Sequence, residues 1–260
     1  MEAGDVKLGA LVKEARTISQ AGLACRRISE RLGFRYFQLG FRIPISLTHP
    51  CQIILSGYPR EWRTRYDDCG YLSIDPVLQH ALATVVPFGW DELEIETPET
   101  RRLFAEAAEY GLRHGFSAVV HGAHGEGALF SFAREEPLPA DMAREELFAR
   151  AKWFTVLLHE RLRKLTNAGL VPYSPLRRLS PRERECLQYA AEGLSATAIG
   201  KTMSISEHTV NFHLGNAEDK LGARTRRHAV ARAVALGEIE PRCYPPELRQ
   251  SQRLVEFQIF

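Results

Sequence analysis

Apolar residues recur at helical spacing along residues 179–239, where the pattern predicts four short helices. Val210, Leu214, Ala217 and Leu221 follow an i, i+4, i+7, i+11 spacing, which places them on one buried helix face. The last helix is expected to bury Val230, Ala233, Val234 and Leu236. Serines can accept hydrogen bonds from the free amides at a helix start, and glycines can take positive φ at a helix end. The predicted starts are Ser180 with Pro181 and Glu183, Ser195 and Ser206, and the predicted ends are Gly193, Gly222 and Gly237.

The first part of the chain mixes two periodicities. Residues 5–33 predict two helices with an interruption near Gly22, and short β-branched and aromatic runs predict strands. A sheet with helices on both faces follows, so the fold class is α+β: an N-terminal α-β-α sandwich built on an antiparallel sheet, plus a C-terminal all-α four-helix domain. The predicted strands are 36–43, 52–56, 117–121 and 128–133, the last two joined by a hairpin over 122–125, and the further helices are 98–114 and 141–165.

Residues 166–178 separate these two regions. They contain Gly169, Pro172 and Pro175 and lack an apolar period, which is typical of a linker. The expected domains are therefore residues 1–165 and 179–240. Residues 241–260 form a C-terminal extension of unknown role, whose alternating end, residues 254–260, fits either a strand or a loosely docked terminus.

Composition adds few constraints. The 260 residues are 45% hydrophobic and 25% charged, as in ordinary globular proteins, and a net charge of +2 leaves any DNA affinity to the local placement of Arg and Lys. Five cysteines without paired metal spacing indicate reduced thiols. The acidic N-terminus lacks the basic start of a signal peptide, and no apolar run reaches the roughly 18 residues of a membrane span. These features predict a cytoplasmic protein with no membrane partner.

The predicted third helix of the C-terminal region is polar opposite its buried face. That face presents His208, Asn211, Gly215 and Glu218, flanked by Thr209, His213, Asn216 and Lys220. Asn can pair bidentately with adenine in the major groove, and guanidinium groups such as Arg224, Arg226 and Arg227 neutralise phosphates. The alternative is a helical bundle whose polarity is incidental.

The motif Leu179-Ser-Pro-Arg-Glu-Arg-Glu185, with Ile205-Ser-Glu-His-Thr-Val-Asn-Phe-His213 and Lys220-Leu-Gly222, resembles the LuxR-type helix-turn-helix of bacterial transcription regulators. Leu194, Ala198 and Gly200 depart from the family pattern, and a glycine inside a helix costs about 1 kcal/mol relative to alanine, so the second helix is expected to be soft. On the polar face of the third helix, Asn211 is expected to read bases with His208 beside it, and Gly215 leaves this face without a side chain at its position. Thr209, Lys220, Arg224 and Arg227 are the expected phosphate contacts.

A second group of residues combines aromatic rings with hydrogen-bonding atoms. Taken singly, each is expected to be an ordinary core or surface aromatic, but the series Tyr58-Pro-x-x-Trp62-x-x-x-Tyr66, Ile74-Asp75-Pro76 and Trp90 is similar to the autoinducer-binding domain of LuxR-family quorum-sensing receptors. Gly111-Leu-Arg-His-Gly115 and His121-Gly122 extend the resemblance over residues 20–165. The signals of these receptors are N-acyl homoserine lactones, so a small-molecule autoinducer is expected and no other cofactor.

The resemblance also assigns roles within this pocket. The Trp62 indole would donate to the lactone carbonyl, the Asp75 carboxylate would accept the amide N–H, and Tyr58 with Ser131 would reach the acyl carbonyl. Tyr66 and Trp90 would wall the lactone ring, Leu39 and Ala128 would line the acyl tail, and Val77 stands where some relatives have a hydroxyl residue. Arg63 is a candidate for a water-mediated contact, although a solvated surface arginine is the favoured interpretation.

The implied mechanism is that ligand orders the sensor, which pairs with itself as a homodimer on a palindromic operator in double-stranded DNA, with RNA polymerase as a further partner. An orphan receptor, or a repressor released by ligand, has the same sequence features. A lactone-processing enzyme using His114, His121, His124 and Asp75 is a remote alternative. These histidines do not share a helix face, and the sequence has no nucleophile elbow or phosphate loop, so no enzyme activity is expected.

Overall fold

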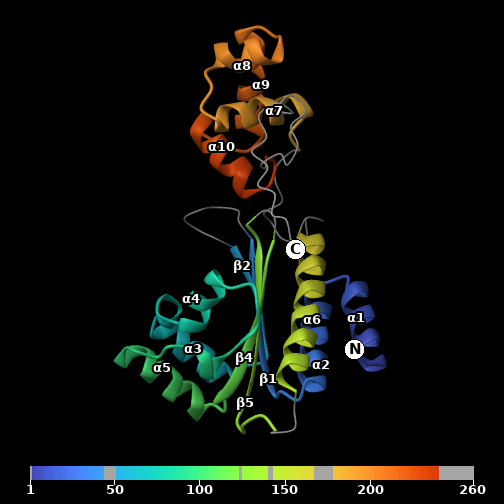
Figure 1. The fold of residues 1–260 in the computed structure, drawn as a ribbon, viewed down its shortest axis with the longest axis vertical. Helices are drawn as coiled ribbons and strands as arrows, with labels where there is room; N and C mark the ends of the chain where they lie inside the picture. The colour runs from blue at the N-terminus through green and yellow to red at the C-terminus, as the bar shows by residue number, and fades with distance from the viewer. Residues whose placement is uncertain (1, 44–50, 123–124, 140–142, 167–177, 240–260) are drawn as a thin grey trace, which may run out of the picture. The chain divides into compact units, whose positions relative to one another are not determined.

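A computed structural model describes residues 2–43, 51–122, 125–139, 143–166 and 178–239 of the chain (Figure 1). The chain divides into two compact units, Met1–Ser174 and Pro175–Phe260. Most of the predicted linker and the predicted C-terminal extension lie outside the described residues. None of the described helices is both long and apolar enough to cross a membrane.

The first unit is built on a five-stranded antiparallel sheet with the strand order β2-β1-β5-β4-β3. Four of its strands match the predicted strands closely, although β4 begins at His114 rather than at Ser117. The fifth strand, β3, has two residues and was not predicted. The strands are β1 Tyr36–Ile43, β2 Cys51–Ser56, β3 Phe88–Gly89, β4 His114–His121 and β5 Gly127–Arg134.

Helices α1 (Ala3–Glu14), α2 (Ile18–Arg31) and α6 (Arg144–Leu165) cover one face of the sheet (Figure 1). They enclose the largest core of the unit, in which Phe116, Phe132 and Phe154 are fully buried. The break between α1 and α2 lies at residues 15–17 and not near Gly22, which was predicted. The Thr17 side chain accepts a hydrogen bond from the amide of Gln20 and starts α2 there, so Gly22 falls inside the helix.

The other face carries α3 (Arg60–Asp68), α4 (Pro76–Ala83) and α5 (Pro98–Glu109), with 3-10 turns at Tyr71–Ser73 and Trp90–Glu92 (Figure 1). The predicted helix 98–114 was too long at its end. Gly111 takes a φ of 82° and sits against the Tyr36 ring, which stops the helix and leaves His114 to begin β4. The fold is therefore the predicted sandwich with helices on both faces.

The second unit contains α7 (Pro181–Ala191), α8 (Ala196–Met203), α9 (Glu207–Lys220) and α10 (Arg226–Ala235). The predicted caps Ser180, Ser195 and Ser206 each accept a backbone amide, and the Glu183 side chain accepts the amide of Ser180 in return. The predicted buried face of α9 is buried. In α10, however, Val234 is 56% exposed, and Ala229 is buried with Ala233, so the prediction for Val234 was wrong.

Gly200 has a structural reason to be in α8. A Cβ at this position would lie 2.7 Å from the carbonyl oxygen of Ile205, and the Ile205 amide donates to the Gly200 carbonyl at 2.9 Å. The chain reverses here through Ser204, which has a φ of 56°. The missing side chain therefore allows a tight approach between α8 and the turn that leads into α9.

Candidate functional site

A cavity of about 470 Å³ lies between the sheet and the helices α3, α4 and α5. Its walls include a set of residues predicted from sequence as ligand contacts. The predicted ligand contacts whose side chains line the cavity are Tyr58, Trp62, Arg63, Tyr66, Asp75, Val77, Trp90 and Ser131. The structure therefore brings together residues that lie up to 73 positions apart, between Tyr58 and Ser131.

Two predicted tail contacts face the other way. Along β1, Phe37, Leu39 and Phe41 are buried against α2 and α6, so Leu39 does not line the cavity and this prediction was wrong. Ala128 borders the cavity, but it pairs with Phe41 and packs in the same core layer, so its side chain belongs to the opposite face. The neighbouring Leu129 lies on the same face of β5 as Ser131, and both side chains face the cavity.

Asp75 occupies the N-cap of α4, where Pro76 takes the first helical position. Its Oδ1 accepts the Val77 amide at 2.9 Å, and its Oδ2 accepts the Tyr66 hydroxyl at 2.8 Å. Burial raises the pKa of Asp75, while the hydrogen bonds from Tyr66 and Val77 partly oppose this shift. A carboxylate offers about four acceptor positions, so Asp75 can accept a further N–H from the cavity.

The hydroxyl groups of Ser117 and Ser131 lie on the sheet side of the cavity, at the end that holds Asp75. The Trp90 indole donates to the Ser117 hydroxyl at 3.0 Å, and the Ser117 and Ser131 hydroxyls lie 2.8 Å apart. Burial, together with the charge of Asp75, raises the pKa of Tyr58, and an interaction with Ser131 opposes that rise. The Tyr58 hydroxyl therefore stays protonated near neutral pH and can donate to an acceptor in the cavity.

Trp62 is buried at the centre of an aromatic cluster. Its ring centroid lies 5.9 Å from Tyr66, 6.1 Å from Tyr71 and 5.7 Å from Tyr110. Among the described residues, the indole N–H has no hydrogen-bond acceptor, although the side chain lines the cavity. This donor is available to a ligand oxygen, which would compensate the cost of burying it.

The helices that carry these residues are held by a carboxylate that sequence analysis missed. Glu106 on α5 accepts two hydrogen bonds from Arg65 at 2.8 Å, one from Tyr71 at 2.8 Å and one from Arg102 at 2.7 Å. The Arg65 and Arg102 guanidinium groups hold the pKa of Glu106 far below its usual range. Arg65 lies 41 residues from Glu106, so no local pattern could have predicted the cluster.

Gly115 was noted only as part of a motif, and the structure gives it a role. A Cβ at this position would lie 2.7 Å from the Trp90 ring and 2.6 Å from the Phe132 carbonyl. The missing side chain of Gly115 therefore lets the Trp90 ring approach β4 closely, and its indole N–H donates to Ser117.

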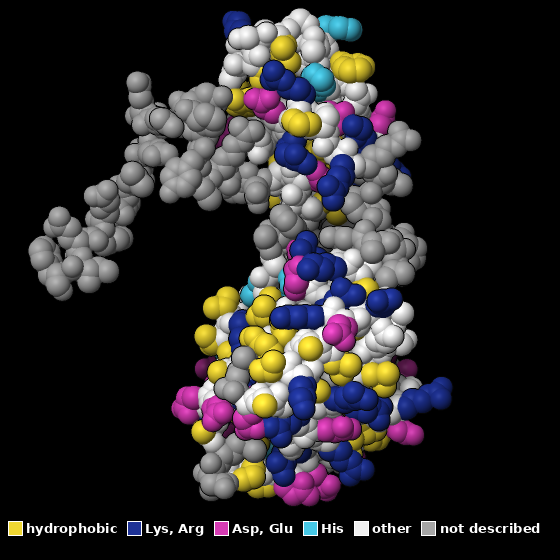
Figure 2. Space-filling model, turned by 90° about the vertical axis from the view of Figure 1, so that its right-hand side faces the viewer, with side chains coloured by type: hydrophobic (Ala, Val, Ile, Leu, Met, Phe, Trp, Pro, Cys, Tyr) yellow, Lys and Arg dark blue, Asp and Glu magenta, His cyan; other side chains and the backbone are white. Residues whose placement is uncertain are grey.

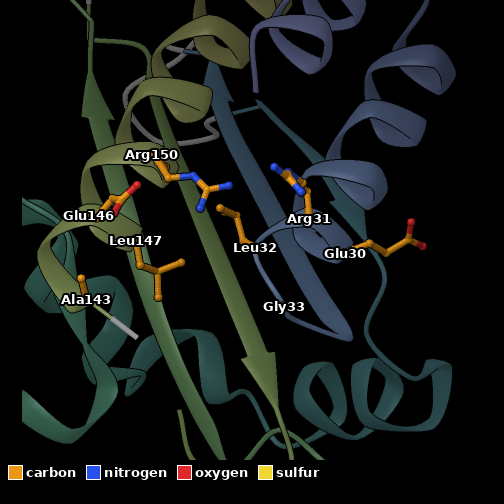
Figure 3. Close-up of a pocket in the computed structure, with 8 residues that line it drawn as sticks. All are labelled: Glu30, Arg31, Leu32, Gly33, Ala143, Glu146, Leu147 and Arg150. Carbon is orange, nitrogen blue, oxygen red and sulfur yellow. The ribbon is translucent and has the colours of Figure 1, made fainter. Parts of the chain in front are cut away.

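A second cavity of about 210 Å³ lies on the opposite side of the sheet, between the end of α2 and the start of α6 (Figure 3). Arg31 and Arg150 reach into it, but both serve the fully buried Asp5 of α1, which Arg150 contacts at 2.9 Å and Arg31 at 3.8 Å. Burial alone would raise the pKa of Asp5, yet the Arg150 and Glu2 hydrogen bonds and the two guanidinium charges outweigh it and lower that pKa. This cavity is part of the ion-paired joint between α1, α2 and α6.

In the second unit, α9 presents the predicted polar face. His208, Asn211 and Gly215 are exposed, Thr209 is half-buried, and the Asn211 side-chain oxygen accepts a hydrogen bond from Arg226 at 2.9 Å. Arg224 and Arg227 are exposed beside the start of α10. Figure 2 shows basic side chains on this unit interspersed with acidic, apolar and histidine side chains. Positive charge is therefore spread over small groups of Lys and Arg rather than one continuous basic surface.

Lys220 has an intramolecular partner. Its ammonium donates to both oxygens of the nearly buried Glu183, at 2.8 and 2.7 Å. This ion pair fastens the end of α9 to the capping box of α7. It competes with the phosphate contact predicted for Lys220.

The histidines of the enzyme alternative do not converge. His114 and His121 lie at opposite ends of β4, where they pair with Arg134 and Gly127 respectively, and His124 lies outside the described residues. The His121 Nε2 is 2.9 Å from the Thr84 carbonyl. Within the described part of the chain, no group of three His, Cys, Asp or Glu residues is arranged to hold a metal ion.

A cavity bordered by buried polar groups in one unit and an exposed helix-turn-helix in the other define the class of protein: a transcription regulator with a small-molecule sensor. Residues 17–162 match the autoinducer binding domain, and residues 177–233 match the family described as bacterial regulatory proteins, luxR family. The chain belongs to the LuxR family of quorum-sensing transcription regulators, which are DNA-binding proteins and not enzymes.

Relatives support this assignment. The chain is 35% identical over 213 residues to the transcriptional activator protein SolR of Ralstonia nicotianae, covering 82% of this chain and 89% of that protein. It is 31% identical over 210 residues to AnoR of Acinetobacter nosocomialis, covering 80% and 87%. Escherichia coli SdiA shares the two-domain fold, with a TM-score of 0.77, 24% identity, and coverage of 92% of this chain and 99% of that chain. The chain is also similar to the N-acylhomoserine lactone dependent LuxR family factor CepR2 of Burkholderia cenocepacia, with a TM-score of 0.51, 26% identity, and coverage of 62% of this chain and 99% of that chain.

Proposed function

We propose that the signal is an N-acyl homoserine lactone and that it binds in the cavity beneath α3, α4 and α5. The observation that carries this proposal is the set of complementary groups at one end of the cavity: the Asp75 acceptor faces the same space as the Trp62 and Tyr58 donors. A lactone of this class has one amide N–H and two carbonyls, and each must regain a hydrogen bond when buried. CepR2, to which this chain is similar, is described as N-acylhomoserine lactone dependent.

Each polar group has a proposed partner. Asp75 accepts the amide N–H, the Trp62 indole donates to the lactone carbonyl, and Tyr58 with Ser131 donates to the acyl carbonyl. Tyr66 and Trp90 flank the lactone ring, and Val77 contributes apolar surface at this end. Arg63 lines the cavity from α3 and is the candidate for a water-mediated contact to the ligand.

For the DNA-binding unit, we propose that Asn211 and His208 read bases, with Gly215 allowing close approach. Thr209, Arg224 and Arg227 contact phosphates. Lys220 contacts a phosphate when its ion pair with Glu183 opens. A homodimer places two such helices on half-sites about 34 Å apart, which requires a palindromic operator. The named relatives are activators, so we propose ligand-dependent activation in the cytoplasm through RNA polymerase.

Calorimetric titration of the full-length protein with a panel of homoserine lactones of different acyl chains tests the ligand. We expect saturable binding of at least one lactone, and binding of none would contradict the proposal. A reporter gene with its operator, read with and without the lactone, gives the direction of regulation. A decrease of expression by the ligand-bound protein, or activity only without ligand, would favour the repressor alternative.

A further inference from the structure

The floor of the cavity is formed by residues on one face of four paired strands. Ser56 and Ser117 share this face but do not line the cavity. The strand register arranges them in three rows that cross the sheet from β2 to β4. The first row is polar, the second is apolar, and the third is polar again. The rows are Ser56, Gln38, Ser131 and Ser117; Ile54, Gly40, Leu129 and Val119; and Gln52, Arg42, Gly127 and His121.

The first row belongs to the end of the cavity that holds Asp75 and the hydroxyl cluster, because Ser131 interacts with Tyr58 and Ser117 bonds Trp90. A strand advances about 3.3 Å per residue, so the third row lies about 13 Å from the first. A lactone held at the first row directs its acyl chain across the second row towards Arg42 and Gln52. The apolar stretch of the floor is only one row wide.

The third row has donors directed at the cavity. Arg42 is half-buried, and its guanidinium lies over Gly127, where a Cβ would be 3.8 Å from Nη2. None of the described carboxylates forms an ion pair with Arg42. The Glu126 side chain packs over Gly122. Burial lowers the pKa of His159, on the other face of the sheet, and the charge of Glu126 opposes this shift. The His121 ring is already engaged by the Thr84 carbonyl, so Arg42 and Gln52 are the donors that remain.

We propose that the cavity selects a homoserine lactone whose acyl chain ends in an oxygen acceptor, by preference a carboxylate, bound by Arg42 and Gln52. This inference rests on the proposed lactone function. A plain alkyl end would remove water from the Arg42 guanidinium without replacing its hydrogen bonds. A carboxylate replaces them with charge-assisted bonds, for which the planar guanidinium is well suited.

The test is calorimetric titration of the full-length protein with N-octanoyl homoserine lactone and with an analogue of the same length whose chain ends in a carboxylate. We expect the carboxylate analogue to bind the wild type roughly tenfold more tightly, as one charge-assisted hydrogen bond implies. Arg42→Leu is expected to reverse this order. Arg42→Lys keeps the charge, and Arg27→Leu removes an exposed arginine from α2, so both are expected to keep the order.

A wild type that binds the octanoyl lactone at least as tightly as the analogue would overturn the inference. The same holds if Arg42→Leu keeps the preference of the wild type. If neither lactone binds any of the four proteins, the proposed function fails and the inference fails with it. The thermal midpoints of the unliganded proteins show that each variant is folded.

Discussion

Two opposing effects act on the ionisation of Asp75. Its position at the α4 N-cap requires an acceptor for the Val77 amide, which favours the ionised carboxylate, while burial beneath Tyr66 disfavours the charge. The net effect is a raised pKa. An amide N–H from a ligand would restore part of the lost hydration, so binding and ionisation of Asp75 are coupled.

Asp75→Asn is expected to weaken lactone binding by roughly tenfold to hundredfold, because a hydrogen bond to a charged acceptor is worth about 1.5–3 kcal/mol. The exposed Asp68→Asn on α3 is the matched control and is expected to bind as the wild type does. Calorimetry measures both. Equal affinities of wild type and Asp75→Asn would remove Asp75 from the site.

The raised pKa of Asp75 also predicts a pH dependence. A carboxyl whose folded pKa is raised favours folding of the unliganded protein as pH falls through that pKa, whereas lactone affinity decreases over the same range because the accepting carboxylate is lost. Titrations at several acidic pH values check this. An affinity that stays constant until the range of an ordinary aspartate would contradict it.

On α9, Asn211 and Arg227 are expected to behave differently. Asn211→Ala should relax specificity at one base step, since its amide can read an adenine edge, whereas Arg227→Ala should weaken binding to all sequences and reduce the salt slope by about 1. Fluorescence anisotropy with operator and mutated operator at several salt concentrations separates the two effects. The reverse assignment would mean that α9 docks in a different register.

Among the elements, polar joints fix how the helices pack. Glu106 ties α3 to α5 above the cavity, Asp5 ties α1 to α2 and α6, and Lys220 with Glu183 ties α9 to α7. Burial tends to raise the pKa of each carboxylate, but the charges and hydrogen bonds of its partners outweigh burial and lower the pKa. Their stabilisation is therefore present at neutral pH and is lost as pH falls through the lowered pKa values.

Lys220→Met is expected to destabilise the DNA-binding unit by about 1.5–3 kcal/mol, because Glu183 stays nearly buried without its charged partner. Chemical denaturation of the unliganded protein measures the loss. The control is Lys201→Met, an exposed lysine of α8. If Lys220→Met kept full stability and only reduced the salt slope of DNA binding, Lys220 would be a phosphate contact rather than a joint.

A substitution at Gly215 tests whether the exposed surface of α9 at this position contacts DNA. A Cβ at this position would meet nothing within 4 Å, so Gly215→Ala should stabilise the helix by about 1 kcal/mol. We expect operator affinity to fall at the same time, because the added methyl group would meet the DNA. A variant that is more stable and binds the operator as tightly as the wild type would place Gly215 away from the interface.

At the scale of the whole molecule, the elements with strong periodicity were predictable and the cavity was predictable in part. β1 was predicted at its observed bounds, and the serine caps of the second unit follow from local chemistry. α3 was missed because Trp62 is its only buried residue, so it has no apolar period. Leu39 was assigned to the cavity through the family resemblance. Both faces of β1 are covered, so alternation alone could not correct this assignment. The Glu106 cluster depends on tertiary contacts only.

The central claim is that occupancy of the cavity determines DNA binding. Ligand linkage stabilises the folded sensor by about 2.7 kcal/mol at a hundredfold excess over the dissociation constant, which is large for one domain. The most direct test is the operator affinity of the purified full-length protein with and without a lactone that binds it. The account predicts tight, dimeric binding only with the lactone, together with a raised thermal midpoint. Equal midpoints, equal dimerisation and equal operator affinity in the absence of lactone would contradict it.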